Sequence, residues 1–115
     1  MSFRFLDAQP GWHVRDLDAA LAFYRALGFE PGHRAGDHHQ VLHRDAVTVH
    51  LSTEEEGAGG CQILVDDVDA VFVTARDLGA EILYDGLGDR PWGCRDFTLR
   101  DPDGNQLTFS QELEA

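Results

Sequence analysis

Two stretches of the chain repeat hydrophobic residues at helical spacing. Apolar side chains recur every three or four positions, with polar and charged residues between them, which is typical of a helix that buries one face. The two stripes are Leu17, Leu21, Tyr24 and Leu27, and Val68, Phe72, Ala75 and Leu78. We therefore expect two amphipathic helices.

Both helices have recognisable ends. Asp16 and Asp67 stand where an N-cap side chain accepts hydrogen bonds from the first free backbone N–H groups. Gly28 and Gly79 follow the last apolar residue of each stripe, where a left-handed residue commonly ends a helix. The helices are therefore bounded on both sides by local signals.

Short segments typical of strands lie before and after each expected helix. Residues 53–60 are charged and glycine-rich and have no periodicity, which indicates a flexible connection. Residues 101–105 combine proline, glycine and asparagine and predict a turn between two strands. The expected strands are 9–14, 30–34, 40–43 and 46–52 in the first half and 60–65, 81–84, 95–100 and 105–111 in the second.

The two halves are copies of one pattern. Residues 14–30 and 65–81 share eight identities at a constant offset of 51 positions, without a gap. The prediction is an α+β chain in one domain, 1–115, built from two tandem βαβββ modules, 1–56 and 57–115, that form a curved mixed sheet around a cleft. Equivalent positions of both modules should line that cleft, because like modules pair about a pseudo-twofold axis.

Composition narrows the class of protein. The chain has 115 residues, 43% of them hydrophobic, and no long apolar run, so a soluble protein without a membrane span is expected. Its net charge of −12 argues against nucleic-acid binding, which needs Lys and Arg to replace counterions. The acidic charge is explained either by solubility through self-repulsion or by a field that attracts cationic small molecules.

The start of the sequence and its cysteines bear on the compartment. The first residues lack the apolar stretch of a signal peptide, so a cytoplasmic protein is expected. Cys61 and Cys94 are too few and too far apart for a disulfide framework or a zinc knuckle. We interpret both as buried thiols.

The duplicated module resembles the vicinal oxygen chelate superfamily. The helix sequence at 16–29, the segment 14–17 and the segment 100–105 carry this resemblance, which spans essentially the whole chain. That group contains glyoxalase, extradiol dioxygenases, fosfomycin-resistance enzymes and bleomycin-binding resistance proteins. The resemblance implies the fold and not one activity, because this fold hosts several chemistries.

A narrower resemblance connects the chain with the bleomycin-resistance proteins. Residues 90–102 look like their Pro-Trp-Gly…Arg-Glu-Phe…Arg-Asp-Pro stretch, and residues 44–49 look like one of their strands. The segment 57–90 is several residues shorter than in those proteins and lies beside the expected cleft. The ligand can therefore differ.

The resemblance also indicates where a metal ion would bind. The metal-dependent members place a ligand on the first and on the last strand of each module. The matching positions here are Gln9 and His50 in module one, and Gly60 and Thr108 in module two. A catalytic metal generally needs three His, Cys or carboxylate ligands, so we expect neither a metal ion nor another cofactor. Alternatively, Gln9 and His50 form a polar pair in a metal-free cleft, with His50 as a base.

The cleft would then bind a small molecule. Trp92 lies in an expected loop and could stack on a planar, cationic ligand, whereas Trp12 and Phe109 are each either groove wall or core. In the bleomycin-resistance proteins an aromatic residue stands where this chain has His39, which can also stack. Ser52 and Arg95 are candidate polar groups at the groove edge, on the resemblance alone.

Three functions are compatible with these features. The first is a homodimer that sequesters a bleomycin-like or other cationic aromatic antibiotic, with each groove made by modules of two chains as the resemblance implies. The second is a metal-dependent lyase, dioxygenase or thiol transferase. The third is a binding protein for an endogenous metabolite.

Overall fold

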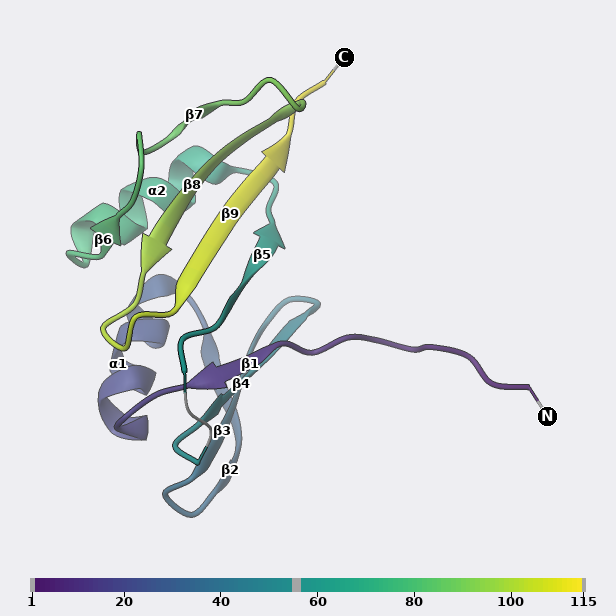
Figure 1. Ribbon diagram of the computed structural model, residues 1–115, viewed down its shortest axis with the longest axis vertical. Coiled ribbons are helices and arrows are strands. Elements are labelled where there is room, and N and C mark those ends of the chain that lie inside the picture. Colours follow the sequence, from purple (N-terminus) through teal and green to yellow (C-terminus); the bar gives the residue numbers. More distant parts are fainter. Residues whose placement is uncertain (1, 55–56, 115) are drawn as a thin grey trace.

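The computed structural model describes residues 2–54 and 57–114 and contains two helices and nine strands in those ranges (Figure 1). Residues 55 and 56 of the expected connection lie outside the described residues. Module one contains β1 (Gly11–His13), α1 (Leu17–Leu27), β2 (Glu30–Ala35), β3 (His39–Arg44) and β4 (Val47–Ser52). Module two contains β5 (Gly60–Leu64), α2 (Val68–Asp77), β6 (Glu81–Ile82), β7 (Gly88–Asp89), β8 (Cys94–Arg100) and β9 (Gln106–Glu112).

Each module forms its own mixed sheet. The strand order is β1-β4-β3-β2 in module one and β5-β9-β8-β6 in module two, where β7 also pairs with β8. In both sheets the first strand of the module runs parallel to the last, and the remaining pairs are antiparallel. The predicted α+β class with a repeated βαβββ order is confirmed.

Most expected strands agree with the structure to within one or two residues. The differences are at β1, which begins at Gly11 rather than at residue 9, and at β6, which has only two residues. The strand β7 was not expected at all. A two-residue strand is too short to produce an alternating pattern. Only its pairing with β8 identifies β7 as a strand.

The predicted helix ends are confirmed. The Asp16 carboxylate accepts hydrogen bonds from the backbone N–H groups of Asp18 and Ala19 at 2.8 and 3.1 Å. The Asp67 carboxylate accepts one from Ala70 at 3.1 Å. Gly28 has a φ of 118°, in the left-handed region that favours glycine. In the described part of the chain, neither helix is long and apolar enough to cross a membrane.

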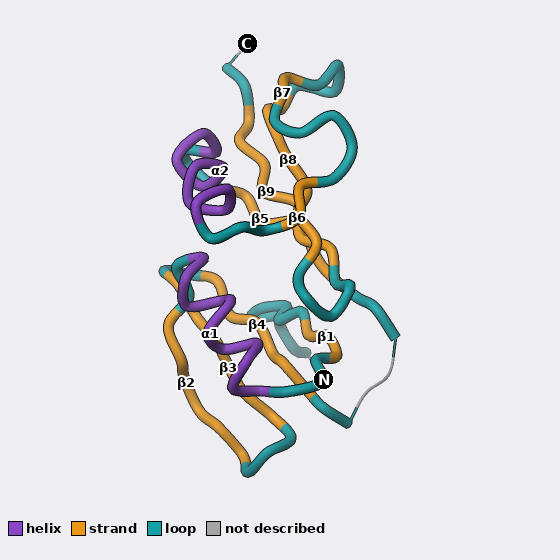
Figure 2. Tube along the Cα trace, turned by 90° about the vertical axis from the view of Figure 1, so that its left-hand side faces the viewer, coloured by secondary structure: helices purple, strands orange, loops and turns teal. Residues whose placement is uncertain are grey.

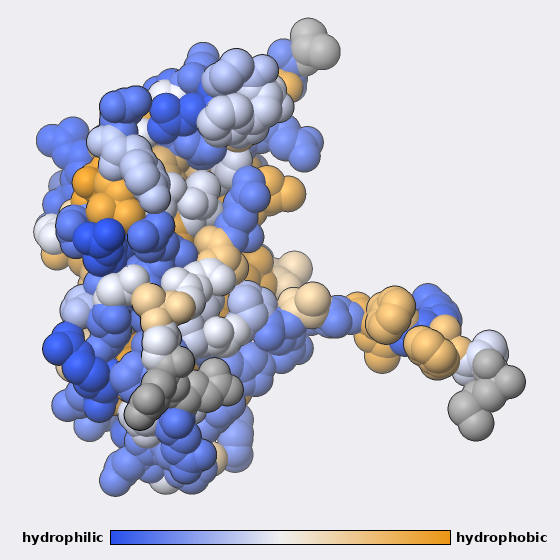
Figure 3. Space-filling view, viewed as in Figure 1, coloured by the Kyte–Doolittle hydropathy of each residue, from blue (hydrophilic) through white to orange (hydrophobic). Residues whose placement is uncertain are grey.

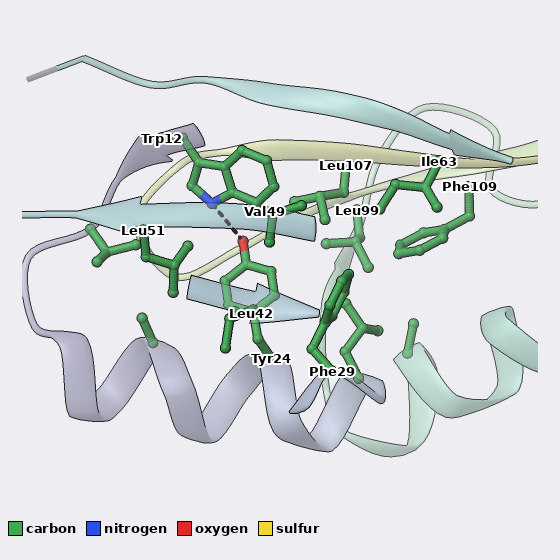
Figure 4. Packing of buried hydrophobic residues seen from close by; sticks show 14 of the residues in the cluster. Trp12, Tyr24, Phe29, Leu42, Val49, Leu51, Ile63, Leu99, Leu107 and Phe109 are labelled. Carbon is green, nitrogen blue, oxygen red and sulfur yellow. Dashed lines mark hydrogen bonds between the residues drawn. The ribbon is translucent and has the colours of Figure 1, made fainter. Parts of the chain in front are cut away.

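One helix covers one face of each sheet, and the opposite faces are left open (Figure 2). Alternate strand residues point toward the helices, and those of both modules form a continuous hydrophobic core. Trp12 from β1 lies in this core, and its indole N–H donates to the Tyr24 hydroxyl at 3.1 Å (Figure 4). The packing of the two helix-covered faces therefore joins the modules.

A buried hydrogen-bond network also links the modules. The Tyr24 hydroxyl of α1 donates to Asp101 Oδ2, in the turn between β8 and β9, at 2.6 Å. Asp101 Oδ1 accepts the backbone N–H groups of Asp103 and Asn105 at 2.9 and 2.8 Å. Asn105 Nδ2 donates to Asp101 Oδ2 at 3.0 Å and to the carbonyl oxygen of His13 at 2.7 Å. The turn predicted at 101–105 thus anchors module two to the end of β1.

The Tyr24 side chain in this network is fully buried. Burial, and secondarily the Asp101 carboxylate, raises the pKa of the Tyr24 hydroxyl far above its ordinary value. The hydroxyl therefore remains protonated, and it donates to the carboxylate in the folded state. This contact fixes the angle between α1 and the turn.

Candidate functional site

The open face of module two contains a groove with a volume of about 820 Å³, whose lining residues all lie between 58 and 108. We call it the module-two groove. Figure 3 views the molecule from the side on which β8 and β9 lie in front of α2, and hydrophilic residues there surround paler and hydrophobic ones. A cavity of this size can accommodate a drug-sized molecule.

The floor of the module-two groove is neutral and polar. Gln62, Thr108 and Thr98 stand in register on the neighbouring strands β5, β9 and β8. The two threonine hydroxyls are hydrogen-bonded to each other at 2.8 Å. This row has no net charge and can form hydrogen bonds with a ligand.

Trp92 lies at the rim of the groove on an anchored turn. The Arg90 N–H donates to the Cys94 carbonyl oxygen at 2.7 Å, and the Gly93 N–H donates to the Arg90 carbonyl oxygen at 3.2 Å. These bonds hold the tip of the turn, while the Trp92 side chain stays 72% exposed. Because the backbone of the turn is already fixed, little backbone entropy is lost when a ligand stacks on the indole.

A largely buried ion pair also holds this turn in place. The Arg90 guanidinium donates through Nε to Asp96 Oδ1 at 2.8 Å and through Nη2 to the Gly86 carbonyl oxygen at 2.7 Å. The Cys94 thiol also contacts Asp96 Oδ2 at 3.5 Å. The pair therefore connects the strand β8 with the loop before β7 and makes the groove wall rigid.

Module one has an open face of its own. His39 Nε2 lies 2.8 Å from His50 Nδ1, and His50 Nε2 lies 2.7 Å from Gln9 Oε1. Because Gln9 Oε1 only accepts, His50 donates through Nε2, and Nδ1 of a neutral His50 ring accepts from His39. Ser52 pairs with His39 in register on this face. Four expected site residues are thus brought together, but they do not line the module-two groove.

Three expected groove residues lie elsewhere. Trp12 is 2% exposed and Phe109 is 4% exposed, both within the hydrophobic core. Arg95 bonds Asp69 at the start of α2 at 2.9 Å and Asp89 at 3.0 Å. The hydrogen bond from Arg95 lowers the pKa of the Asp69 carboxyl below its ordinary value. Of the two alternatives for Trp12 and Phe109 the core is correct and the groove wall is wrong, and the expectation that Arg95 lies at the groove edge is corrected. Alternation along their strands turns all three toward the helices.

The side chains at the expected metal positions do not fit the family metal site. Gly60 has a φ of 149°, and a Cβ atom there would overlap the carbonyl oxygen of Gln106, so no ligating side chain can stand at this position. The Thr108 hydroxyl is bonded to Thr98, and both ring nitrogens of His50 are engaged. Among the described residues, no group of three or more His, Cys, Asp or Glu side chains could hold a metal ion.

Sequence reasoning missed several lining residues of the module-two groove. Asp96 and Thr98 share the open face of β8, and they could have been found from alternation because Phe97 and Leu99 point to the core. Tyr84 and Arg90 lie outside regular strands, where no periodicity exists to be read. Their place in the groove follows only from the loops around β7.

Comparison with known proteins places the chain in a single superfamily. The model of the family described as the Glyoxalase/Bleomycin resistance protein/Dioxygenase superfamily matches residues 11–109. The bleomycin resistance proteins of Geobacillus stearothermophilus and Staphylococcus aureus are each 26% identical over 132 residues, covering 96% of this chain and 99% of theirs.

Solved structures agree with this placement. TioX from Micromonospora sp. ML1 is 26% identical with a TM-score of 0.80, over 93% of this chain and 99% of its own. A bleomycin-binding protein solved in complex with bleomycin is 24% identical with a TM-score of 0.79, over 94% and 99%. A lactoylglutathione lyase from Agrobacterium tumefaciens has the same fold at 21% identity, with a TM-score of 0.78 over 91% and 92%.

Proposed function

The chain belongs to the Glyoxalase/Bleomycin resistance protein/Dioxygenase superfamily, and on that premise we propose that it binds and sequesters a bleomycin-like or other cationic aromatic antibiotic without a metal ion. The observation that carries this proposal is Trp92, an exposed indole on an anchored turn at the rim of a drug-sized groove. The bleomycin resistance proteins that the chain resembles over nearly its whole length support it.

The charge of the protein favours a cationic ligand. A net charge of −12 produces a negative potential around the molecule and raises the local concentration of cations. A positive planar group over the indole face of Trp92 gains a cation–π attraction of about 0.5–2 kcal/mol. Charge brings the ligand to the protein, and stacking retains it.

Sequestration needs affinity and no chemical step. The groove offers hydroxyl and amide groups on its floor and an ion pair whose partners are already bound to each other. Gly60 stands at the position where the metal-dependent relatives would place a ligand on β5, and its backbone leaves no space for a side chain. These features support binding rather than metal-assisted catalysis.

A homodimer would complete the groove. Within one chain the open face of module one, with Gln9, His39, His50 and Ser52, is separate from the module-two groove, which is lined from 58 to 108 only. A second copy could place its module-one face over this groove, and the pseudo-twofold relation of the modules allows two equivalent grooves per dimer. The proposed ligand site is therefore shared by both protomers.

The dimer can be tested by sedimentation. The chain has a mass of 12.8 kDa, and we expect equilibrium sedimentation at micromolar concentrations to return twice this value. Substituting His39 by alanine removes a ring that the proposal places in the shared face and should weaken ligand binding without changing the fold. A strictly monomeric protein would contradict the shared groove.

Ligand binding can be tested without a metal ion. We expect metal-free bleomycin to bind the chelator-treated protein at one molecule per chain in the micromolar range or tighter, with a change in tryptophan fluorescence. Trp12 is sealed in the core, so the change reports on Trp92. The affinity should be the same before and after chelator treatment. The absence of both a fluorescence change and binding heat would refute the proposed ligand class.

A further inference from the structure

Tyr84 is a second exposed aromatic residue on the module-two groove. Tyr84 lines the groove and is 79% exposed, although burial would stabilise a side chain of this size. Its hydroxyl lies 3.3 Å from Gln106 Oε1, at the start of β9. The neighbouring Leu83 N–H donates to the Thr98 carbonyl oxygen at 2.8 Å, which fixes the base of the loop on β8.

The backbone at Tyr84 is unfavourable for a tyrosine. Its φ is 56°, in the left-handed region, and the turn is closed by a hydrogen bond from the Gly86 N–H to the Leu83 carbonyl oxygen. The other non-glycine residue described with a positive φ is Asp45, and aspartate tolerates this conformation in turns. Glycine or asparagine would form the Tyr84 turn more easily. Such conformations concentrate at functional sites, and here the ring is held over a groove instead of in the core.

Tyr84 and Trp92 stand at opposite ends of the groove. The turn that carries Trp92 leads into the first residue of β8, Cys94, whereas Tyr84 reaches Gln106, which pairs with the last residue of β8, Arg100. Six residue steps along a strand span about 20 Å. The hydroxyls of Thr98 and Thr108 lie on the floor between these ends.

We infer that Tyr84 and Trp92 are two separate aromatic subsites of one groove, and that the ligand is an elongated molecule with a planar group near each end. The chain between the planar groups lies over the neutral polar floor and can accept or donate hydrogen bonds there. This inference rests on the proposed function because it defines the ligand class of the same groove. The net charge of −12 favours planar groups that are cationic.

Two probes can distinguish a groove with one aromatic subsite from a groove with two. Dequalinium carries two cationic aminoquinaldinium rings joined by a decamethylene chain, and N-methyl-4-aminoquinaldinium is its single-ring counterpart. We expect the two-ring probe to bind the wild-type protein at least about tenfold more tightly, because the second ring binds at a high effective concentration. Calorimetry measures both affinities. Equal affinity for the two probes, or no binding of dequalinium at millimolar concentration, would overturn the inference.

Variants assign the second ring to Tyr84. In Tyr84→Gly the advantage of the two-ring probe should disappear, while Tyr84→Phe should retain it because the ring stays in place. Val73→Ala, which shortens an exposed side chain on α2, is the matched control and should change nothing. Glycine accepts the positive φ, so Tyr84→Gly should melt no earlier than wild type, and its lost affinity then cannot be attributed to unfolding.

The outcomes also distinguish this inference from the proposed function. If bleomycin does not bind but the two-ring probe keeps a Tyr84-dependent advantage, the antibiotic class is wrong and the two subsites stand. If bleomycin binds, and Tyr84→Gly binds both probes as wild type does, the second subsite is refuted and sequestration stands.

Discussion

Asp101→Ala is expected to lower the free energy of unfolding by about 4 kcal/mol. The carboxylate is 3% exposed and accepts four hydrogen bonds, from the Tyr24 hydroxyl, the Asn105 side-chain amide and two backbone N–H groups. Alanine leaves the Tyr24 hydroxyl and the two Asn105 N–H groups buried without an acceptor, and the half-buried Asp103 N–H loses its acceptor as well. The loss also releases the turn 101–105 from α1. Urea denaturation followed by circular dichroism measures the change.

Two further variants calibrate this loss. Glu81→Ala also removes a paired carboxylate, but its contact with Arg100 at 2.9 Å lies on the surface, so we expect a cost of about 1 kcal/mol or less. Tyr24→Phe removes one donor from the carboxylate and leaves the buried Trp12 indole N–H without an acceptor, with an expected cost of about 2 kcal/mol. If Asp101→Ala costs no more than Glu81→Ala, the network does not hold the modules together.

Trp92→Ala is expected to weaken the binding of metal-free bleomycin about 30-fold or more, which corresponds to about 2 kcal/mol. The indole is the large aromatic surface that the anchored turn between β7 and β8 presents to the groove, and stacking removes it from water. Calorimetry is the appropriate measurement, since this variant lacks the fluorescent reporter. Trp92→Phe should recover part of the affinity because a smaller ring still stacks.

The fold of the variant should not change. Trp92 is mostly exposed in the free protein, so its removal should alter the free energy of unfolding by about 0.5 kcal/mol or less. Arg95→Ala serves as a comparison, because Arg95 bonds Asp69 and Asp89 on the helix side of the sheet. We expect it to leave ligand affinity nearly unchanged. Wild-type affinity in Trp92→Ala would remove the main support for the proposed ligand class.

The helices and their ends could be predicted from the sequence because their signals are local. Asp16 and Asp67 cap the next turn of their own chain, and Gly28 ends α1 through its own backbone conformation. The constant offset of 51 positions between the two similar stretches then predicted that both modules contain the same elements in the same order. These features depend on residues a few positions apart, and tertiary contacts did not override them.

The candidate site was predicted only in part. Trp92 could be predicted because a proline and a glycine beside an indole indicate an exposed loop. The missing metal ligand at Gly60 could be predicted because glycine has no side chain. Trp12, Arg95 and Phe109 were assigned to the groove although their side chains point toward the helices. Alternation with Phe97 and Leu107 places Arg95 and Phe109 on that face.

The sequence by itself determined the repeated α+β module, the helix caps, the turn at 101–105 and the acidic charge, because periodicity and capping act over a few residues. Only the tertiary structure decided which face of each sheet stays open, that Asp101 joins the modules through Tyr24, and that Tyr84 and Trp92 share one groove. Those outcomes depend on strand register and on contacts between residues as far as 92 positions apart, such as the Asn105 amide and the His13 carbonyl oxygen. No local pattern encodes such distances, because the contacts arise only when the two modules pack together.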